Sequence, residues 1–454
     1  MNAFLPPAGS TLVVGLGRTG TSLLAHLERH GRPAAGYDDR SGEVLARVGR
    51  DRPGLALTAG TVPETWWERL AGLAVSPGVP STHPVLVEAR RRGLAVEGDI
   101  EFFARTAEAP ILGVTGTNGK STVVALLGAM ATRAGRRVAV GGNYGTPALD
   151  LLSRPEPELY VLELSSFQLE LTSSLRTRAA VVLNLTEDHL DRHGSLAAYA
   201  AAKERIYQGA EIAVGNRDDA HVAAMLARQH GERRTFGLDR PRGEDYGLEE
   251  GEDGGWLVGG GRRLLPVRDL LLVGRHNLRN VQAAWALADA AGLPEDAVRD
   301  AARTFPGLPH RMQAVGEHAG VRYYDDSKAT NVGATVAALG ALDRPVVAIF
   351  GGQGKGQSFA PLAAAARGRL RAAVLLGEDA PALARALEGV CPLAAASDME
   401  EAVRRASALA RRGDAVLLAP ACASFDMFRD YADRGERFRR AVEALGAVPA
   451  GVHP

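Results

Sequence analysis

The chain has 454 residues, which is too long for one ordinary domain and fits two or three domains with separate cores. Its composition, 46% hydrophobic and 23% charged residues, is typical of a globular protein. The formal net charge is zero, which argues against a nucleic-acid-binding or membrane-binding surface.

The first residues, MNAFLPPAGSTLVV, have neither a basic segment nor a long apolar core, so we expect no signal peptide. No apolar run approaches the roughly 18 residues that a membrane-spanning helix needs. The two cysteines, Cys391 and Cys422, cannot form a disulfide framework and lack metal-ligand spacing. The sequence therefore predicts a cytoplasmic protein.

The N-terminal part alternates strand and helix patterns. TLVVGLG predicts a strand that enters a glycine turn, TSLLAHLERHG a helix, and PAAGYDD and GLAVSPGVP two further strands, which together indicate a parallel sheet. The turn GLGRTG, with Asp38 ending the next strand, fits a dinucleotide-binding fingerprint. Because doubly wound domains also use such a turn for other nucleotides or for packing, the turn leaves its ligand open.

The alternation restarts at APILGVTGTNGKSTVV, which predicts a strand, a phosphate-binding loop and a helix. Val114 occupies the first glycine position of the common P-loop, so this loop is a variant. Gly116 and Gly119 would let backbone N–H groups surround phosphate oxygens at a helix N-terminus. Lys120 would neutralise phosphate charge, and the Ser121 hydroxyl would bind Mg²⁺.

Two apolar strands, PELYVLELSSF and AAVVLNLTEDH, then end in polar residues. Ligand-binding groups belong at the carboxyl ends of strands in open α/β sheets. Because a buried carboxylate is costly unless it is paired or binds a metal, Glu163 suits Mg²⁺ beside the phosphates. Asp188 and His189 follow the other strand and add polar groups at the same edge of the sheet. The alternatives are a solvent-facing glutamate and a structural histidine.

Residues from about 231 to 268 are rich in glycine and charge, which predicts small antiparallel strands or loops. HNLRNVQAAWALADAAG predicts a helix. After GLPHRMQ a third alternation begins, with VRYYDDS, PVVAIFGG, AAVLLG and AVLLAP as strands. The predicted fold is therefore α/β, with three domains bounded near residues 103 and 308 and a mostly parallel central sheet.

Lysine is rare in this chain. Of the 53 Lys and Arg residues only four are lysine: Lys120, Lys203, Lys328 and Lys355. Arginine serves elsewhere, and only lysine offers a compact amine that can lose its proton or act as a point charge on phosphate. Each lysine is therefore a functional candidate. The neutral amine of Lys203 could also take up CO₂ and become an anionic metal ligand, although spacing alone does not show this.

Six motifs occur in one order: TGTNGKST, LELSSFQLE, NLTEDHLDRHG, RHNLRNVQAA, GLPHRMQ and DDSKATNVGAT. This series resembles the Mur ligases, the ATP-dependent amide-forming enzymes of peptidoglycan precursor assembly. DSKATN, GGQGKGQSF and LAPACASFDMF resemble the members of that family that add D-glutamate.

The resemblance implies an N-terminal Rossmann-like domain that binds the UDP of the substrate (1–103), a central P-loop-type ATP-binding domain (104–308) and a C-terminal Rossmann-like amino-acid-binding domain (309–454). It implies ATP-dependent addition of D-glutamate to UDP-N-acetylmuramoyl-L-alanine through an acyl phosphate, with ADP and phosphate as products. This reaction would serve cell-wall synthesis, cell shape and division. We expect small-molecule partners only, with no nucleic acid and no membrane, and a monomer.

The resemblance also assigns residues by position. Those of the UDP-substrate site would be Gly17, Arg18, Thr19, Asp38, Asp39, Arg40, Ser76, Asn143 and Gln168. Those of the ATP site would be Gly116, Thr117, Asn118, Gly119, Lys120, Ser121, Thr122, Asn277, Asn280, His310, Arg311 and Asp326. Those of the D-glutamate site would be Lys328, Thr330, Lys355, Ser424 and Phe428. Two Mg²⁺ ions would be held by Ser121, Glu163, His189 and Lys203, the last as a carbamate, and the catalytic residues would be Lys120, Glu163, His189 and Lys203.

Three other interpretations stay open. One is a related ligase that adds L-alanine or a diamino acid, or a folylpolyglutamate synthetase, against which DSKATN argues. Another is a dinucleotide-dependent oxidoreductase, which would leave the second loop and the lysines without a role. The third is a nucleotide-gated module without catalysis. The loop from Gln353 to Gln357 also has neutral residues where relatives often carry an aspartate.

Overall fold

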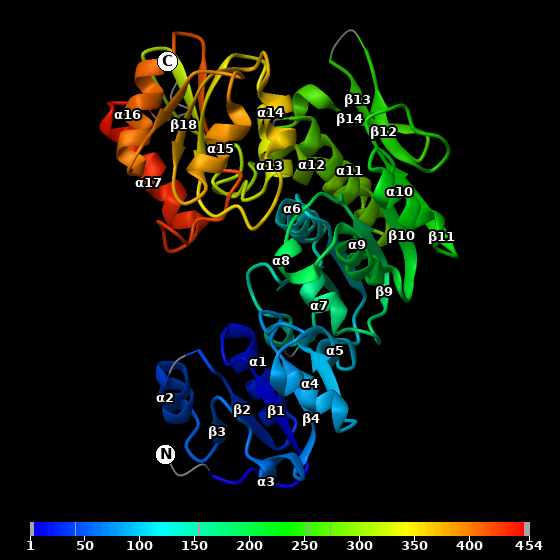
Figure 1. Cartoon of the computed structure of the whole chain (residues 1–454). Helices are drawn as coiled ribbons and strands as arrows, with labels where there is room; N and C mark the ends of the chain where they lie inside the picture. The colour runs from blue at the N-terminus through cyan, green and yellow to red at the C-terminus, as the bar shows by residue number, and fades with distance from the viewer. Residues whose placement is uncertain (1–3, 41, 153–154, 252–253, 273, 449–454) are drawn as a thin grey trace.

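The computed structural model describes residues 4–40, 42–152, 155–251, 254–272 and 274–448. Three α/β units follow one another along the chain, each around its own sheet. Figure 1 shows the N-terminal unit (blue) at one end, the C-terminal unit (yellow to red) at the other, and the central unit between them.

The N-terminal sheet is fully parallel, in the order β3-β2-β1-β4-β5. Its strands are β1 (Ser10–Val14), β2 (Ala34–Tyr37), β3 (Ala56–Thr58), β4 (Leu70–Val75) and β5 (Ala95–Gly98). Its helices are α1 (Arg18–Arg29), α2 (Gly42–Asp51), α3 (Glu64–Trp67), α4 (Pro84–Arg91) and α5 (Asp99–Ala104). The strand order reverses between β1 and β4, and ligands of doubly wound sheets bind at such a switch point.

The central sheet has nine strands in the order β14-β13-β12-β11-β10-β9-β6-β8-β7. They are β6 (Ile111–Thr115), β7 (Val138–Gly142), β8 (Leu159–Glu163), β9 (Thr177–Val182), β10 (Ala210–Asn216), β11 (Glu232–Phe236), β12 (Tyr246–Glu249), β13 (Trp256–Gly259) and β14 (Arg262–Pro266). Pairing is parallel from β7 to β12 and antiparallel from β12 to β14. The antiparallel strands lie in the glycine-rich segment where the sequence predicts strands of this kind or loops.

The helices of the central unit include α6 (Lys120–Arg133), which follows the phosphate loop and packs against α11 and α12. The others are α7 (Ser166–Glu170), α8 (Leu190–His193), α9 (Leu196–Glu204), α10 (Ala220–Ala227), α11 (Arg275–Ala290) and α12 (Glu295–Thr304), with 3₁₀ turns η1 (Ala148–Leu151), η2 (Arg205–Tyr207) and η3 (Val267–Asp269). Because nine residues of α6 are buried, the helix that begins at Lys120 is held rigidly beneath the loop.

The C-terminal sheet has six strands in the order β15-β16-β20-β17-β18-β19, parallel except for the β15–β16 pair. Its strands are β15 (Gln313–His318), β16 (Val321–Asp325), β17 (Val346–Gly351), β18 (Leu370–Leu376), β19 (Leu393–Ala395) and β20 (Ala415–Leu418). Its helices are α13 (Val332–Leu339), α14 (Ala360–Ala366), α15 (Ala380–Leu387), α16 (Met399–Leu409) and α17 (Tyr431–Ala444).

The predicted fold class, three α/β units with mostly parallel sheets, is confirmed. The expected boundary at 308 falls between α12 and β15, whereas the one at 103 falls inside α5. Helix α5 packs into both neighbouring units: Phe102 and Phe103 share a core with Leu23 of α1 and with Tyr160 of β8. Among the described residues, no helix combines the length and apolar character needed to span a membrane.

Candidate active site

The first cavity, of about 720 Å³, lies at the β1–β4 switch point and extends to the central unit. All nine residues predicted for the UDP-substrate site line it: Gly17, Arg18, Thr19, Asp38, Asp39, Arg40, Ser76, Asn143 and Gln168. The last two belong to the central unit, at the end of β7 and on α7. The cavity is therefore shaped for an elongated ligand that reaches from the first sheet to the second.

The carboxylate of Asp38 forms the main hydrogen bonds that shape this cavity. Its Oδ2 accepts the backbone N–H of Leu16 at 2.6 Å, and the Arg40 guanidinium binds both carboxylate oxygens, at 3.0 and 2.7 Å. Burial alone would raise the pKa of Asp38, but the hydrogen bonds from Arg40 and Leu16 bring it below the usual value. The carboxylate is thus ionised at neutral pH and can accept hydrogen bonds from a ligand.

The glycines of the first loop serve close packing. A Cβ on Gly20 would lie 1.9 Å from the carbonyl oxygen of Gly15, so only glycine lets α1 approach the end of β1. Gly15 itself has a φ of +86°, and its carbonyl oxygen accepts the Ser76 hydroxyl at 2.6 Å. The turn thereby opens the β1 end of the sheet to a ligand.

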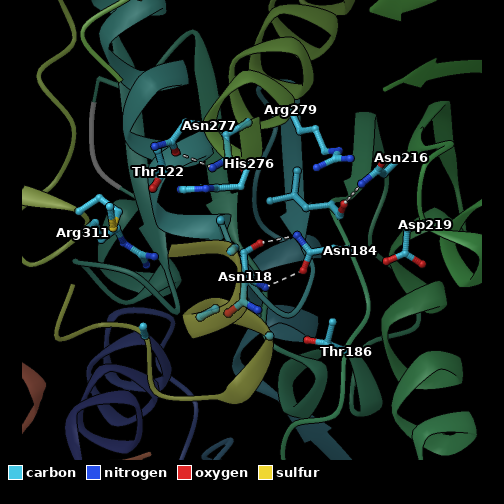
Figure 2. A pocket seen from close by; sticks show the side chains of 18 of the residues that line it. Asn118, Thr122, Asn184, Thr186, Asn216, Asp219, His276, Asn277, Arg279 and Arg311 are labelled. Carbon is cyan, nitrogen blue, oxygen red and sulfur yellow. Dashed lines mark hydrogen bonds between the residues drawn. The ribbon is translucent and has the colours of Figure 1, made fainter. Parts of the chain in front are cut away.

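The second cavity, of about 400 Å³, lies between the central sheet and the start of α13 (Figure 2). Seven of the predicted ATP-site residues line it: Asn118, Gly119, Thr122, Asn277, Asn280, Arg311 and Asp326. Burial raises the pKa of Asp326 to about 7, so this carboxyl group is partly protonated at neutral pH.

Polar residues that the sequence analysis did not single out also line the second cavity: Asn184, Thr186, Asn216, Asp218, Asp219, His276 and Arg279. Asn184 accepts the Asn118 N–H at 2.8 Å and donates to its carbonyl oxygen at 3.0 Å, a reciprocal pair visible in Figure 2. Burial lowers the pKa of His276 to about 4, so its ring is neutral. Asn184 follows β9 and Asn216 ends β10, so the strand-end argument applied to Glu163 could have found both.

The third cavity, of about 260 Å³, joins the phosphate loop to the C-terminal unit. Thirteen predicted residues line it: Thr117, Asn118, Gly119, Lys120, Ser121, Asn143, Glu163, His189, Arg311, Lys328, Thr330, Lys355 and Ser424. Asn143 also lines the first cavity, while Asn118, Gly119, Arg311 and Lys328 also line the second. The third cavity therefore adjoins the other two: it shares Asn143 with the first cavity and residues of the phosphate loop with the second.

The phosphate loop has the geometry expected of an anion-binding turn. Gly119 has a φ of +87°, and a Cβ there would lie 2.4 Å from Oδ1 of Asn280. The Lys120 ammonium donates to the carbonyl oxygens of Gly116 at 2.9 Å and Thr117 at 2.8 Å. Burial lowers the pKa of Lys120, which is partly offset by the nearby Glu163. An incoming phosphate would supply the countercharge that this buried ammonium needs.

Oxygen ligands for a hard cation converge beside this loop. The Ser121 hydroxyl donates to Glu163 Oε2 at 2.7 Å, and the Asn143 amide donates to Oε1 at 2.7 Å. Arg311 of the C-terminal unit donates to the Ser121 oxygen at 3.1 Å. No cluster of three or more His, Cys, Asp or Glu side chains occurs in the described part of the chain, so a bound Mg²⁺ would draw on Ser121, Glu163 and substrate oxygens. Such a mixed set suits Mg²⁺.

Asp188 and His189 face the third cavity after β9. Asp188 pairs with Lys355 at 3.3 Å and accepts the Asn331 amide at 3.2 Å, two contacts that cross from the C-terminal unit. Burial alone would raise the pKa of Asp188, yet the charge of Lys355 holds it below the usual value. Burial lowers the pKa of His189, which also has a left-handed φ of +53°. Such backbone strain in a non-glycine residue is concentrated at functional sites.

Lys203 lies behind the loop, fully buried on α9, and lines none of the three cavities. Its amine donates to the Gly116 carbonyl oxygen at 2.9 Å and lies 4.5 Å from the centre of the Tyr199 ring. Burial, reinforced by the charge of Lys120, holds the pKa of Lys203 well below its usual value. The lowered pKa favours the uncharged amine that carbamate formation requires.

Besides Lys203 and Gly116, two further predicted residues, Phe428 and His310, lie outside the three cavities. Phe428 packs against the core that covers one face of the C-terminal sheet, with the Arg437 guanidinium 5.5 Å from its ring centre, and Phe425 lines the third cavity instead. His310 binds Asp325 at 2.6 Å, a contact that raises its pKa. Arg311, which follows His310 and is also a predicted residue, lines the second and third cavities.

Family models match most of the chain. A Mur ligase MurD-like N-terminal domain covers residues 9–98, a Mur ligase middle domain 114–288, and a Mur ligase glutamate ligase domain 310–422. The chain belongs to the Mur ligase family. The family expected from the sequence motifs is confirmed.

Curated relatives resemble this Mur ligase over nearly its full length. A UDP-N-acetylmuramoylalanine–D-glutamate ligase of Nitrosococcus oceani is 48% identical over 441 residues, covering 96% of this chain and 97% of the relative. A protein of the same name from Pseudomonas aeruginosa is also 48% identical, over 96% of this chain and 98% of its own length.

Solved structures share the fold. A pseudomurein peptide ligase type C from Methanothermus fervidus superposes with a TM-score of 0.61 at 17% identity, covering 96% of this chain and 100% of that one. A UDP-N-acetylmuramate–alanine ligase from Thermotoga maritima gives 0.59 at 20% identity, covering 96% and 99%. At these identities the likeness supports the three-unit architecture alone.

Proposed function

We propose that this Mur ligase joins the amino group of D-glutamate to the L-alanyl carboxylate of UDP-N-acetylmuramoyl-L-alanine, with conversion of ATP to ADP and phosphate. The activity agrees with the shared name of relatives that are 48% identical over nearly the whole chain. The observation that carries the proposal is that the third cavity adjoins both others, through Asn143 on one side and the phosphate loop on the other, because the reaction brings three substrates together.

Each cavity would hold the body of one substrate, and the third would also hold the reacting ends of the other two. The first would hold UDP near Asp38 and Arg40, with the muramoyl part passing Gln168 and Asn143. The second would hold the adenosine of ATP, and the third the reacting carboxylate, the γ-phosphate and D-glutamate. Asn143 lies on the wall common to the first and third cavities, so the L-alanyl end of the substrate would reach the phosphate loop there.

The first chemical step needs charge neutralisation, because an anionic carboxylate must attack an anionic γ-phosphate. Lys120 and the backbone N–H groups of the loop would hold the phosphate oxygens in line for attack. Ser121, Glu163 and His189, together with Lys203 as a carbamate, would hold two Mg²⁺ ions. When bound, these ions neutralise charge that builds up on the phosphoryl oxygens. The product of this step is an acyl phosphate on the L-alanyl residue.

The second step is attack by the neutral amine of D-glutamate on the acyl phosphate, followed by loss of phosphate. Lys328, Lys355, Thr330 and Ser424 line the third cavity and offer cations and hydroxyls for the two carboxylates of D-glutamate. Phe428, which lies in the C-terminal core, would act through packing. Asp188 and His189 are the candidates for accepting the proton of the amine.

We further propose that the enzyme works as a cytoplasmic monomer with small-molecule partners only. The net charge of zero supports the absence of nucleic-acid and membrane partners.

Phosphate release from ATP tests the function, with Mg²⁺, UDP-N-acetylmuramoyl-L-alanine and, in turn, D-glutamate, L-glutamate, L-alanine and diaminopimelate. We expect release only with the nucleotide substrate and D-glutamate together. Release with a different amino acid would preserve the ligase chemistry and overturn the assignment of the third cavity. No release with any amino acid would overturn the proposal.

A further inference from the structure

His193, the last residue of α8, ties together both ends of α7. Its side chain is 1% exposed, with Nδ1 lying 3.2 Å from Glu170 Oε1 and Nε2 lying 3.0 Å from Ser166 Oγ. Because a carboxylate can only accept, Nδ1 carries the proton in the neutral ring and the Ser166 hydroxyl donates to Nε2. Ser166 begins α7 and Glu170 ends it, so one imidazole fixes the whole helix.

The same three groups form the triad of some hydrolases, but here they cannot act as one. Ser166 is 3% exposed and lines none of the three cavities. A nucleophile must reach its substrate. The Ser166–His193–Glu170 array therefore holds α7 in place.

Arg192, the preceding residue, links this array to the N-terminal unit. Its guanidinium lies 4.1 Å from the centre of the Phe167 ring, and its NH1 donates to the Pro77 carbonyl oxygen at 2.9 Å. The Phe167 ring also stacks on His193, with centres 5.4 Å apart and planes at 21°, and meets the edge of His189 at 5.0 Å. The Phe167 ring is thus in contact with three side chains of the α8 segment, those of His189, Arg192 and His193.

These contacts connect two of the cavities. Pro77 and Phe167 line the first cavity, whereas His189, at the start of α8, lines the third. Arg192 and His193 line neither. We propose that Arg192 and His193 are positioning residues of the ligase: they fix Phe167, and through it hold the substrate in the first cavity in register with His189 in the third. This inference rests on the proposed function.

Arg192→Met tests the inference, with Arg29→Met as its matched control. Arg29 also crosses between the N-terminal and central units, donating to the carbonyl oxygens of Leu152 at 3.1 Å and Leu149 at 3.0 Å, and it lies outside the three cavities. Both changes keep an apolar stem and remove hydrogen bonds between the same two units. A general loss of contact between the units would therefore affect both variants alike.

We expect Arg192→Met to weaken binding of UDP-N-acetylmuramoyl-L-alanine about tenfold and to lower kcat about tenfold, because small misplacements at a reacting centre are costly. The KM for ATP should stay within about twofold, and Arg29→Met should match the wild type in all three quantities. The inference would be overturned if both variants lost affinity and kcat equally. It would also be overturned if Arg192→Met lowered the melting temperature without changing substrate binding or kcat. Binding measured by calorimetry needs no turnover, so it tests the positioning role even if wild-type phosphate release failed and the proposed function fell.

A double-mutant cycle with Phe167→Leu gives a second test. If Arg192 acts through Phe167, the double variant should lose no more affinity than the more damaged single variant. If the fold-losses in affinity of the two single variants multiply in the double variant, Arg192 acts independently of Phe167, which would contradict the inference. His193→Phe, which keeps a ring against Phe167 but loses both hydrogen bonds, should reproduce the loss of kcat.

Discussion

The first and second glycine loops of this chain have the same local architecture and opposite chemistry. Each follows the first strand of a parallel sheet and opens a helix, α1 at Arg18 and α6 at Lys120. Beside the first loop, the charge that faces the ligand is the carboxylate of Asp38, which is already paired with Arg40. Arg18, the first residue of α1, is exposed. In the second loop a buried ammonium, Lys120, has no carboxylate within hydrogen-bonding distance in the described structure and is held by carbonyl oxygens.

The difference teaches that a glycine turn sets the space for a ligand, whereas the first helical residues and the facing strand ends decide its identity. Asp38 provides directional acceptors for a neutral base or a sugar. The second loop provides a buried cation and, on β8, Glu163 beside Ser121, which suit phosphate and its metal ion. The predictions below test this division, from the largest expected effect to the smallest.

Replacing the first residue of α6 or of α1 by methionine should reveal the largest difference between the two loops. Lys120→Met should lower kcat about 10³-fold, because it removes a buried charge directed at the transferring phosphate. Arg18→Met should change only the KM for the nucleotide substrate, by a few-fold. Steady-state phosphate release measures both. Similar effects on kcat would contradict the assignment of phosphate chemistry to the second loop alone.

Filling the first loop should damage the fold of the N-terminal unit. We expect Gly20→Ala to cost about 3 kcal/mol in the free energy of unfolding, because its Cβ would lie 1.9 Å from a backbone oxygen. Gly42→Ala, where no heavy atom lies within 4 Å, is the control and should leave stability almost unchanged. Urea unfolding of both variants measures this. A stable Gly20→Ala variant would show that the close approach of α1 to Gly15 is dispensable.

Removing the negative charge of Asp38, beside the first loop, should weaken binding of the nucleotide sugar and leave ATP binding unchanged. Asp38→Asn should raise the Kd for UDP about tenfold, since a charged acceptor bonded to Leu16 and Arg40 is lost. The Kd for ATP should stay unchanged. Calorimetric titration with UDP and with ATP measures both, and weaker ATP binding would break the division between the loops.

The smallest expected effect is a pH dependence of dicarboxylate binding near Lys328, on the C-terminal side of the third cavity. Burial lowers the pKa of Lys328 to about 8, so this lysine loses its charge as the pH rises through that value. The Ki of glutarate, a dicarboxylate without an amine, should therefore rise roughly fourfold between pH 7 and 8.5. In Lys328→Gln the Ki should be high and independent of pH. A flat profile in the wild type would remove Lys328 from carboxylate binding.

Much of the fold could be predicted because alternation of apolar strands and helices is local. The four C-terminal strands expected from the sequence are present, but β15 and β19 were not predicted, since they are short or half-exposed and carry few apolar residues. Strand β10 was also missed, although Ile212, Ala213 and Val214 form a buried apolar run. Helix α5 shows why the first boundary could not be placed: its two phenylalanines belong to a core shared by both units.

The site was predictable where residues follow strands or glycine loops, as for Glu163, Asp38 and Lys120. Which residues of an irregular turn line a cavity was not predictable, because no periodicity fixes their direction: of the predicted pair His310 and Arg311 only Arg311 lines a cavity, and Phe425 does so where Phe428 was expected. The Arg192 contact to Pro77 was equally hidden, since 115 residues separate the two and no periodicity encodes the pairing.

The most direct test of the division between the loops is amide hydrogen exchange with one ligand at a time. UDP-N-acetylmuramoyl-L-alanine alone should protect the amides of residues 15–20 and of α7, and a non-hydrolysable ATP analogue alone should protect residues 116–122. This pattern would support separate roles for two turns of one architecture. Protection of residues 15–20 by the ATP analogue would contradict the account.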